Sequence, residues 1–298
     1  MSGKVLVSGS SGPIGSALLP VLKERDYQIT QLVRRPATGQ NQIQWDPTQP
    51  VNPSSLSGFD AVVHLAGESI VGRWTAAKKA AIRDSRVLGT RHLAEGLATA
   101  PKPPRVLVSA SAIGYYGDRC EELLREDSGP GQGFLAEVCQ QWEAATTPAA
   151  QVNIRVVHLR IGMVLSAAGG ALAAMVRPFR LGFGGRIGSG LQWWSWIEVR
   201  DLVDAILHAI ETESLYGPIN AVSPNPVTNS EFTRALARAL SRPAMFPLPS
   251  FAARLVLGQM ADELLLASQR VESTRLLGSR FRFRYPDLAA SLRANLGR

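Results

Sequence analysis

The sequence predicts an α/β fold, a doubly wound parallel sheet with a smaller C-terminal lobe. Three observations predict it. Short apolar runs alternate with helical patterns over residues 4–222. A glycine-rich turn, GSSGPIG at residues 9–15, joins the first apolar run to the first helical pattern. After Gly162 the alternation gives way to segments rich in glycine, tryptophan and proline, which predicts a smaller, loop-rich region.

The apolar runs are typical of buried parallel strands, and the patterns between them are typical of helices. We expect strands at residues 5–7, 28–33, 42–45, 60–66, 105–109, 153–160 and 217–222. We expect a first helix carrying Leu18 and Leu22, and further helices near 75–97, 134–145, 172–179 and 197–211. Residues 228–231, TNSE, resemble a helix start, and the remainder reads as small helices and loops.

Composition narrows the class of protein. The net charge is +8, but the arginines are spread along the chain, apart from a loose cluster at 270–284, and no nucleic-acid recognition motif accompanies them. No run of 18 apolar residues is present, and the first twenty residues lack the pattern of a signal peptide. The two cysteines, Cys120 and Cys139, fit a reducing compartment, and the four histidines show no metal-ligand spacing. We therefore expect a cytoplasmic monomer or homodimer without nucleic-acid, membrane or metal partners.

The glycine turn is a candidate phosphate site. Strand, glycine turn and helix, in this order, point backbone N–H groups and a helix N-terminus at a phosphate. The alternative is an ordinary tight turn between a strand and a helix. The residues expected to hold a pyrophosphate are Gly9, Ser10, Ser11, Gly12, Pro13, Ile14 and Gly15.

The end of the second strand indicates which nucleotide is bound. An acidic residue there bonds the ribose 2′-OH of NAD, whereas arginine accommodates the 2′-phosphate of NADP. Arg34 and Arg35 occupy this position, and no acidic residue lies between Asp26 and Asp46. This favours NADP(H), unless the two arginines are merely solvated. A Rossmann-like NADP-binding domain would then span 1–165 and about 197–222, with a substrate lobe at about 166–196 and 223–298.

Several motifs resemble the extended, epimerase-like branch of the short-chain dehydrogenase/reductase superfamily. They are GSSGPIG at 9–15, DAVVHLAGE at 60–68, SASAIGYYGD at 109–118 and WIEVRDLVDAI at 196–206. More narrowly, RWT at 73–75, PFRLGFGGRIGSG at 178–190 and NAVSP at 220–224 look like the atypical group named epimerase family protein. This group includes the human short-chain dehydrogenase/reductase family 39U member and bacterial relatives, some of which carry a cell-division-inhibitor label. It is described as NADP-binding, NAD-dependent epimerase/dehydratase-like, with unassigned substrates.

The resemblance implies further site residues. The adenosine side of the cofactor would pass near Leu65, Ala66, Gly67 and Glu68. The alternative for Glu68 is a structural role at a helix start or in a loop. Ser109, Ile161 and Val164 would approach the nicotinamide. Arg86 would bind ribose or phosphate, and Ser111 matches the active-site serine of the superfamily.

The superfamily's Tyr-x-x-x-Lys pair is absent. An alignment on Glu143 places Leu135 and Cys139 at its two positions, and neither side chain can replace the pair chemically. One interpretation is an oxidoreductase or nucleotide-sugar-epimerase-like enzyme in which Tyr115 or Tyr116 is the proton donor and Arg86 or Arg160 supplies the charge. A second is an NADP(H)-binding sensor or partner-binding protein with weak or no catalysis, linked to cell division. A third is a fold that binds another nucleotide-like ligand.

The region after Gly162 contains candidate substrate contacts. Trp193 and Trp194 lie where extended members place the substrate-binding loop, and they either stack on a substrate or pack in the core. Arg186 either binds an acidic substrate group or is solvated.

Overall fold

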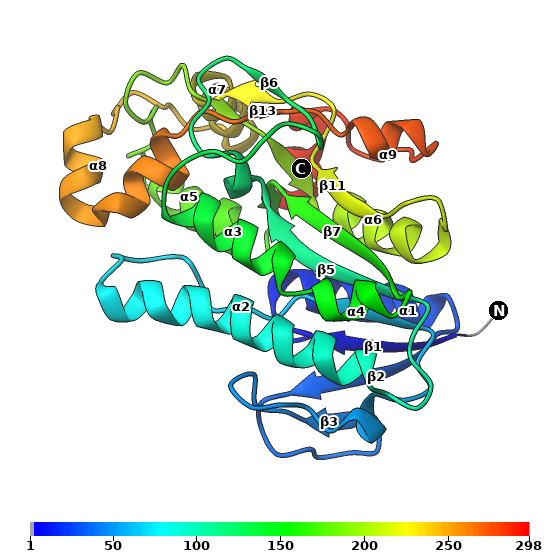
Figure 1. Cartoon of the computed structure of the whole chain (residues 1–298). Helices are drawn as coiled ribbons and strands as arrows, with labels where there is room; N and C mark the ends of the chain where they lie inside the picture. The colour runs from blue at the N-terminus through cyan, green and yellow to red at the C-terminus, as the bar shows by residue number, and fades with distance from the viewer. Residues whose placement is uncertain (1–2, 298) are drawn as a thin grey trace.

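Seven parallel strands form the central sheet of the computed structural model, which describes residues 3–297 (Figure 1). They are β1 (Lys4–Ser8), β2 (Gln28–Val33), β3 (Gln42–Gln44), β4 (Ala61–His64), β5 (Val106–Ala112), β7 (Arg155–Ile161) and β11 (Gly217–Ala221). Their order is β11-β7-β5-β4-β1-β2-β3. The order reverses between β1 and β4, and this switch point is where doubly wound sheets bind ligands. The predicted α/β fold class is confirmed.

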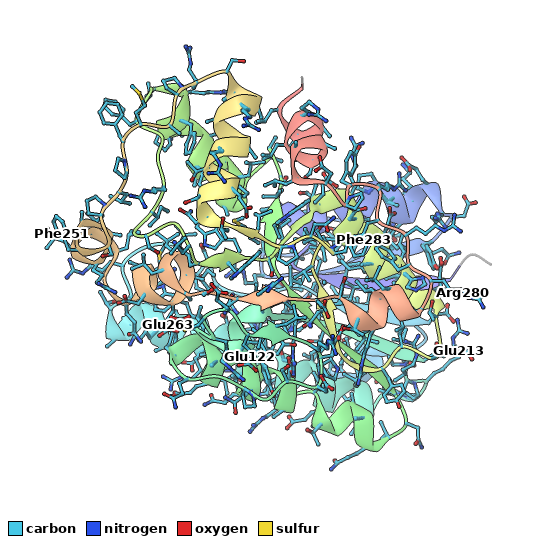
Figure 2. All side chains as sticks on the ribbon, turned by 90° about the horizontal axis from the view of Figure 1, so that it is seen from above. Glu122, Glu213, Phe251, Glu263, Arg280 and Phe283 are labelled. Carbon is cyan, nitrogen blue, oxygen red and sulfur yellow. The ribbon has the colours of Figure 1, made fainter. Side chains whose placement is uncertain are left out.

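A second group of elements follows β7. The helices α5 (Gly170–Arg180), α7 (Asn229–Leu240) and α10 (Leu288–Leu296) share a core with the fully buried Trp196. Three short strand pairs lie beside them: β8 (Met163–Leu165) with β10 (Trp196–Glu198), β9 (Trp193–Trp194) with β12 (Val227–Thr228), and β6 (Leu123–Leu124) with β13 (Arg270–Val271). Phe251, in α8 (Ser250–Leu257), and Arg280, just after α9 (Thr274–Gly278), lie at opposite ends of the molecule (Figure 2). The predicted division into an NADP-binding domain and a substrate lobe stays a prediction. Residues 1 and 2 of the predicted domain and residue 298 of the predicted lobe lie outside the described residues.

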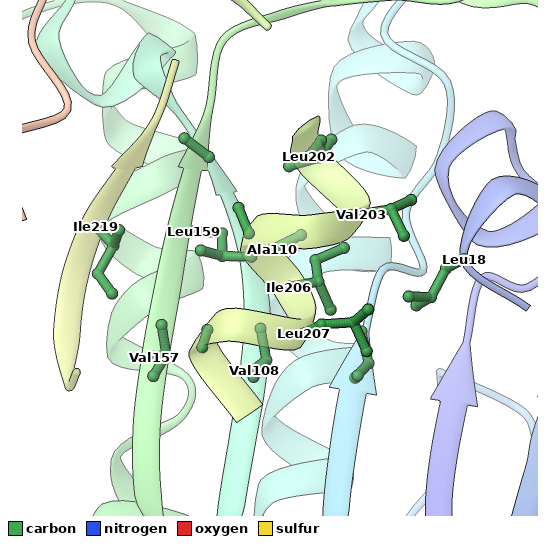
Figure 3. Packing of buried hydrophobic residues seen from close by; sticks show 14 of the residues in the cluster. Leu18, Val108, Ala110, Val157, Leu159, Leu202, Val203, Ile206, Leu207 and Ile219 are labelled. Atoms are coloured by element: carbon green, nitrogen blue, oxygen red, sulfur yellow. The ribbon is translucent and has the colours of Figure 1, made fainter. Parts of the chain in front are cut away.

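Helices cover both faces of the sheet, which explains why the central strands β1 and β4 are buried along almost their whole length. On one face, Val5 and Val7 pack with α1 (Pro13–Glu24) and α6 (Val199–Glu211). On the other, Leu6 packs with α2 (Ala76–Ala98), and α3 (Phe134–Ala144) and α4 (Thr147–Gln151) lie beside α2. Figure 3 shows α6 lying over β5 and β7, with Ile206 above Val108 and Val157.

Two helix starts show how local hydrogen bonds set the boundaries. The helix expected at 197–211 begins at Val199, because residues 196–198 extend as β10 and the Glu198 carboxylate accepts the N–H groups of Arg200 (2.5 Å) and Asp201 (3.3 Å). The helix start predicted at 228–231 is confirmed, since Thr228 and Glu231 form a reciprocal capping box. The short helix α4 was not predicted.

Candidate functional site

The glycine turn packs against the end of β4 without room for side chains. Gly9 has a φ of +71°, and a Cβ on it would lie 2.6 Å from the carbonyl carbon of Leu65. A Cβ on Gly15 would lie 2.3 Å from the carbonyl oxygen of Gly9. Because no side chain fits at either position, the turn presents bare backbone at the switch point.

The N-terminus of α1 opens onto this turn. Its N-cap is Gly12, which makes no side-chain cap, and Pro13 begins the helix. The first turn holds no acidic residue, so no side-chain carboxylate from it neutralises the positive end of the helix dipole. The Ser10 hydroxyl donates to Gln31 Oε1 at 2.8 Å and ties the turn to β2, while Ser11 is exposed and Ile14 packs against the core. This geometry suits a phosphate group.

The tip of β2 is positively charged. Arg34 and Arg35 follow the strand and are both exposed. Across the switch point, the Glu68 carboxylate accepts a hydrogen bond from Lys78 Nζ at 2.6 Å. This bond, together with the charges of Lys78, Arg34 and Arg86, holds the pKa of Glu68 below its usual value. Glu68 is therefore engaged by Lys78, whereas Arg34 and Arg35 form no ion pair with any side chain of residues 3–297 and can meet an anion.

Arg86 on α2 is fixed beneath the loop that follows β4. Its guanidinium donates to the carbonyl oxygens of Glu68 (2.9 Å) and Ile82 (3.1 Å). It also lies over the Trp142 ring, 5.1 Å from the centroid. A Cβ on Gly67 would lie 3.3 Å from Arg86 Cζ, so the loop residues Ala66 and Gly67 run directly over this charge. Burial lowers the pKa of Arg86 from its usual value.

A buried ion pair lies at the end of β5. Arg160 on β7 donates to both carboxylate oxygens of Glu143 on α3, at 2.8 and 2.9 Å, and the two side chains are only 4% and 12% exposed. The Ser111 hydroxyl donates to the same carboxylate at 2.7 Å. Burial lowers the pKa of Arg160, but the hydrogen bonds and charge of Glu143 outweigh it and raise the pKa overall. Ser111 is only 2% exposed, and this hydrogen bond fixes the direction of its hydroxyl; its contact with a substrate stays a prediction.

The two candidate tyrosines have different surroundings. The Arg160 guanidinium lies 3.5 Å from the centroid of the half-buried Tyr115 ring. Tyr116 is fully buried, and its hydroxyl lies 2.7 Å from Asn220 Oδ1, 2.9 Å from the Arg125 carbonyl and 3.0 Å from Arg160 Nη1. Burial raises the pKa of Tyr116. A hydroxyl held at three points inside the protein cannot readily exchange a proton with a substrate, so we retain only Tyr115 as a candidate donor.

The positions of the missing Tyr-x-x-x-Lys pair form an apolar wall. Leu135 and Cys139 on α3 are buried, and a Cβ on Gly114 would lie 3.3 Å from Leu135 Cβ and 3.9 Å from Cys139 Sγ. Burial, reinforced by the charge of Glu143, raises the pKa of the Cys139 thiol to about 12. Cys139 is thus neutral near pH 7 and packs as an apolar side chain.

The remaining predicted cofactor contacts lie along neighbouring strands. Ser109 is buried in β5, and its hydroxyl donates to the Ala110 carbonyl at 3.3 Å. Ile161 ends β7, and Val164 in β8 is partly buried. Their contact with a nicotinamide stays a prediction.

The predicted substrate contacts differ in accessibility. Trp194 is buried, with its ring 5.3 Å from that of Phe232, which favours the core-packing alternative. Trp193 is partly buried, and the Arg270 guanidinium lies 4.4 Å from its ring centroid. Arg186 is exposed and donates to the Ser189 carbonyl at 2.6 Å. A substrate role for Trp193 and Arg186 stays a prediction.

Sequence reasoning missed a contact that joins the C-terminal region to α3. The Glu263 carboxylate accepts the N–H groups of Phe134 (3.0 Å) and Leu135 (2.7 Å) at the N-terminus of α3. A Cβ on Gly133 would lie 3.1 Å from Glu263 Cδ, so the glycine before the helix was the only signal for this cap. Next to it is a cavity of about 240 Å³, lined by Gly114, Leu135 and Glu263 among others. Within residues 3–297, no group of three or more His, Cys, Asp or Glu side chains is arranged to hold a metal ion.

Comparison with known proteins identifies the family. Residues 5–221 match the model of the NAD dependent epimerase/dehydratase family, and residues 248–294 match a domain of unknown function, DUF1731. The chain belongs to the NAD dependent epimerase/dehydratase family. The resemblance to the epimerase family proteins is also confirmed.

Three relatives of this family member are similar along its whole length. Epimerase family protein Mb2239 of Mycobacterium bovis is 42% identical over 290 residues, which cover 97% of this chain and 96% of the relative. The crystal structure of human epimerase family protein SDR39U1 (isoform 2) with NADPH has a TM-score of 0.91 and 36% identity, and the match covers 99% of each chain. A nucleoside-diphosphate sugar epimerase from Corynebacterium glutamicum has a TM-score of 0.84 and 39% identity, covering all of this chain and 59% of that chain.

Proposed function

We propose that this family member binds NADP(H) at the switch point of its sheet and acts as an oxidoreductase or nucleotide-sugar-epimerase-like enzyme on a small molecule. One observation carries the proposal. The close-packed glycine turn of residues 9–15 leads into the N-terminus of α1, which carries no side-chain cap, and Arg34 stands at the tip of β2 with no carboxylate beside it in the chain. The NADPH in the crystal structure of human SDR39U1 supports the same cofactor here.

Each group in the site has a chemical role in this proposal. NADP(H), when bound, supplies the hydride-transfer chemistry. The backbone of residues 9–15 binds the pyrophosphate, and Arg34 binds the 2′-phosphate. Ser111 orients a substrate oxygen, and Tyr115 exchanges a proton with it. The free thiols of Cys120 and Cys139 support our placement of the protein in the reducing cytoplasm.

Titration with NADPH and NADH tests the cofactor assignment. We expect tighter binding of NADPH, because the Arg34 guanidinium pairs with the 2′-phosphate. Arg34→Asp should weaken NADPH at least about ten-fold and leave NADH less affected, since one charge-assisted pair is replaced by repulsion. The matched control is Arg91→Asp, at an exposed position of α2. Equal or better NADH affinity in the unaltered protein would contradict the assignment.

The second candidate function is an NADP(H)-binding sensor with little catalysis. The apolar wall of Leu135 and Cys139 favours it, because leucine has no exchangeable proton and the buried Cys139 thiol keeps its proton at neutral pH. A screen of carbonyl compounds and nucleotide sugars, followed by NADPH oxidation, separates the two functions. If the enzyme function holds, Tyr115→Phe should reduce turnover roughly 100-fold or more while NADPH affinity is retained. A silent screen despite tight NADPH binding would favour the sensor.

A further inference from the structure

One region of the surface is strongly apolar. Nine of the fifteen large hydrophobic side chains that are exposed in residues 3–297 come from the segments 181–191 and 245–256, and eight of the nine are more than half exposed. They are Leu181, Phe183, Leu191, Met245, Phe246, Leu248, Phe251, Leu255 and Val256. Exposure on this scale in two short segments indicates a surface that is covered by a partner.

The two segments form one continuous surface. The N–H of Phe246 donates to the Gly184 carbonyl at 3.1 Å, and the N–H of Leu248 donates to the Arg186 carbonyl at 2.8 Å. The Phe183 and Phe246 ring centroids are 6.0 Å apart. Helix α8 follows directly, at Ser250. We call this region, residues 181–191 and 245–256, the apolar C-terminal surface.

Helix α8 has the most exposed apolar side chain of this surface, Leu255. Of its eight residues only Ala253 is buried. Phe251 and Leu255, four residues apart on one face of the helix, are 71% and 75% exposed. A helix with an apolar outer face is normally buried on that face. Instead, α8 lies at the edge of the molecule (Figure 1), and Phe251 lies at its periphery (Figure 2).

The sequence segments that carry and flank this surface are positively charged. The segments 170–192 and 241–261 contain no aspartate or glutamate and five arginines: Arg177, Arg180, Arg186, Arg242 and Arg254. Arg254 pairs with Asp262, whereas the other four form no ion pair with the described residues. Two copies that met through this surface would bring these arginines together, and the repulsion disfavours self-association. An anionic partner is complementary to it.

We propose, contrary to the expectation from the sequence that the protein has no membrane partner, that the apolar C-terminal surface docks on an anionic phospholipid bilayer. Exposed aromatic and aliphatic side chains at a protruding edge enter the headgroup region, and flanking arginines bind lipid phosphates. The protruding shape favours a lipid surface over a protein helix, which binds in a groove. Docking at the surface is compatible with the finding that none of the described helices has the length and hydropathy to cross a bilayer. This inference is independent of the cofactor site.

Vesicle flotation of the full chain tests the proposal. The probes are vesicles of equal parts phosphatidylcholine and phosphatidylglycerol, and vesicles of phosphatidylcholine alone. The protein should float with the anionic vesicles, and added salt should weaken this binding. Replacing both Phe251 and Leu255 by serine should reduce binding at least about ten-fold, because two apolar side chains no longer leave water. Replacing Arg177 and Arg180 by glutamine should reduce it roughly five-fold for each arginine that contacts the headgroups.

The matched control replaces Tyr216 and Leu277 by serine, which are exposed hydrophobic residues outside this surface. It should float as the unaltered protein does, and circular dichroism together with urea unfolding shows that every variant is folded. Absence of flotation with anionic vesicles would overturn the proposal. So would equal flotation of the Phe251/Leu255 variant. A dimer in light scattering that dissociates in this variant, without flotation, would assign the surface to self-association instead.

Discussion

Arg160 contacts Glu143 and both tyrosines that the sequence offered as proton donors. Its guanidinium binds both oxygens of Glu143, lies on the Tyr115 ring and reaches the Tyr116 hydroxyl. Glu143 in turn accepts the Ser111 hydroxyl. A fixed positive charge thus stands near Ser111, the predicted active-site serine, although the superfamily's lysine is missing. Its partner is a carboxylate, so the pair orients neighbouring groups and is unsuited to proton transfer.

Glu143→Gln tests how much this ion pair contributes to the stability of the fold. The substitution leaves Arg160 buried beside a neutral amide, and breaking a buried pair costs about 3 kcal/mol or more. We expect the free energy of unfolding in urea to fall by about this amount. The control is Glu122→Gln, which alters the largely exposed pair with Arg119 and should cost less than about 1 kcal/mol. Equal effects of the two substitutions would show that the buried pair is not structurally important.

At the scale of elements, the turn between β1 and α1 was predictable, because its glycines lie within seven residues of each other, at 9, 12 and 15, and this spacing is typical of a tight phosphate-binding turn. The seven sheet strands were also predictable from apolar runs. The ends of helices were less predictable. Helix α6 begins two residues later than expected because Glu198 caps it. The cap on α3 was not predictable, since Glu263 lies 128 residues after Leu135.

Gly15→Ala tests the packing of this turn. The added Cβ would lie 2.3 Å from the Gly9 carbonyl oxygen and 2.6 Å from Ser10 Cα, both parts of the backbone. We expect a loss of about 3 kcal/mol in the free energy of unfolding, as for other overpacked sites, together with weaker NADPH binding. Gly39→Ala is the control, because nothing lies within 4 Å of its added Cβ. A Gly15 variant as stable as the Gly39 variant would refute the close approach of α1 to the turn.

At the scale of the whole molecule, His64 links the central sheet to helix α2, which packs on one of its faces. It is fully buried at the end of β4 and bonds Ser8 on β1 at 2.6 Å and Thr90 on α2 at 2.9 Å. Burial lowers its pKa from 6.5 to about 4. As pH falls below 6.5, His64 therefore binds a proton in the unfolded chain, whereas in the folded protein it binds one only near pH 4.

The free energy of unfolding should consequently decrease as pH falls through this window. His64 contributes about 3 kcal/mol to the decrease, which is complete below the folded pKa and absent above the unfolded one. Urea unfolding at a series of pH values measures it. His64→Gln should remove this part of the pH dependence, whatever its effect on stability at pH 7. His92→Gln should keep the dependence of the unaltered protein, and an unchanged slope in the His64 variant would contradict the assignment.

The sequence by itself determined the α/β class, the strands of the sheet, the glycine turn and the family, because these depend on patterns within short stretches of chain. Tertiary structure alone decided which side chains meet. Ser111 and Arg160 reach Glu143 from 32 and 17 residues away, and Tyr116 bonds Asn220 across 104 residues. It also decided that Trp194 is buried while Phe251 and Leu255 are exposed. Hydropathy gives a side chain its preference for burial, but the packing of distant elements determines whether that preference is met.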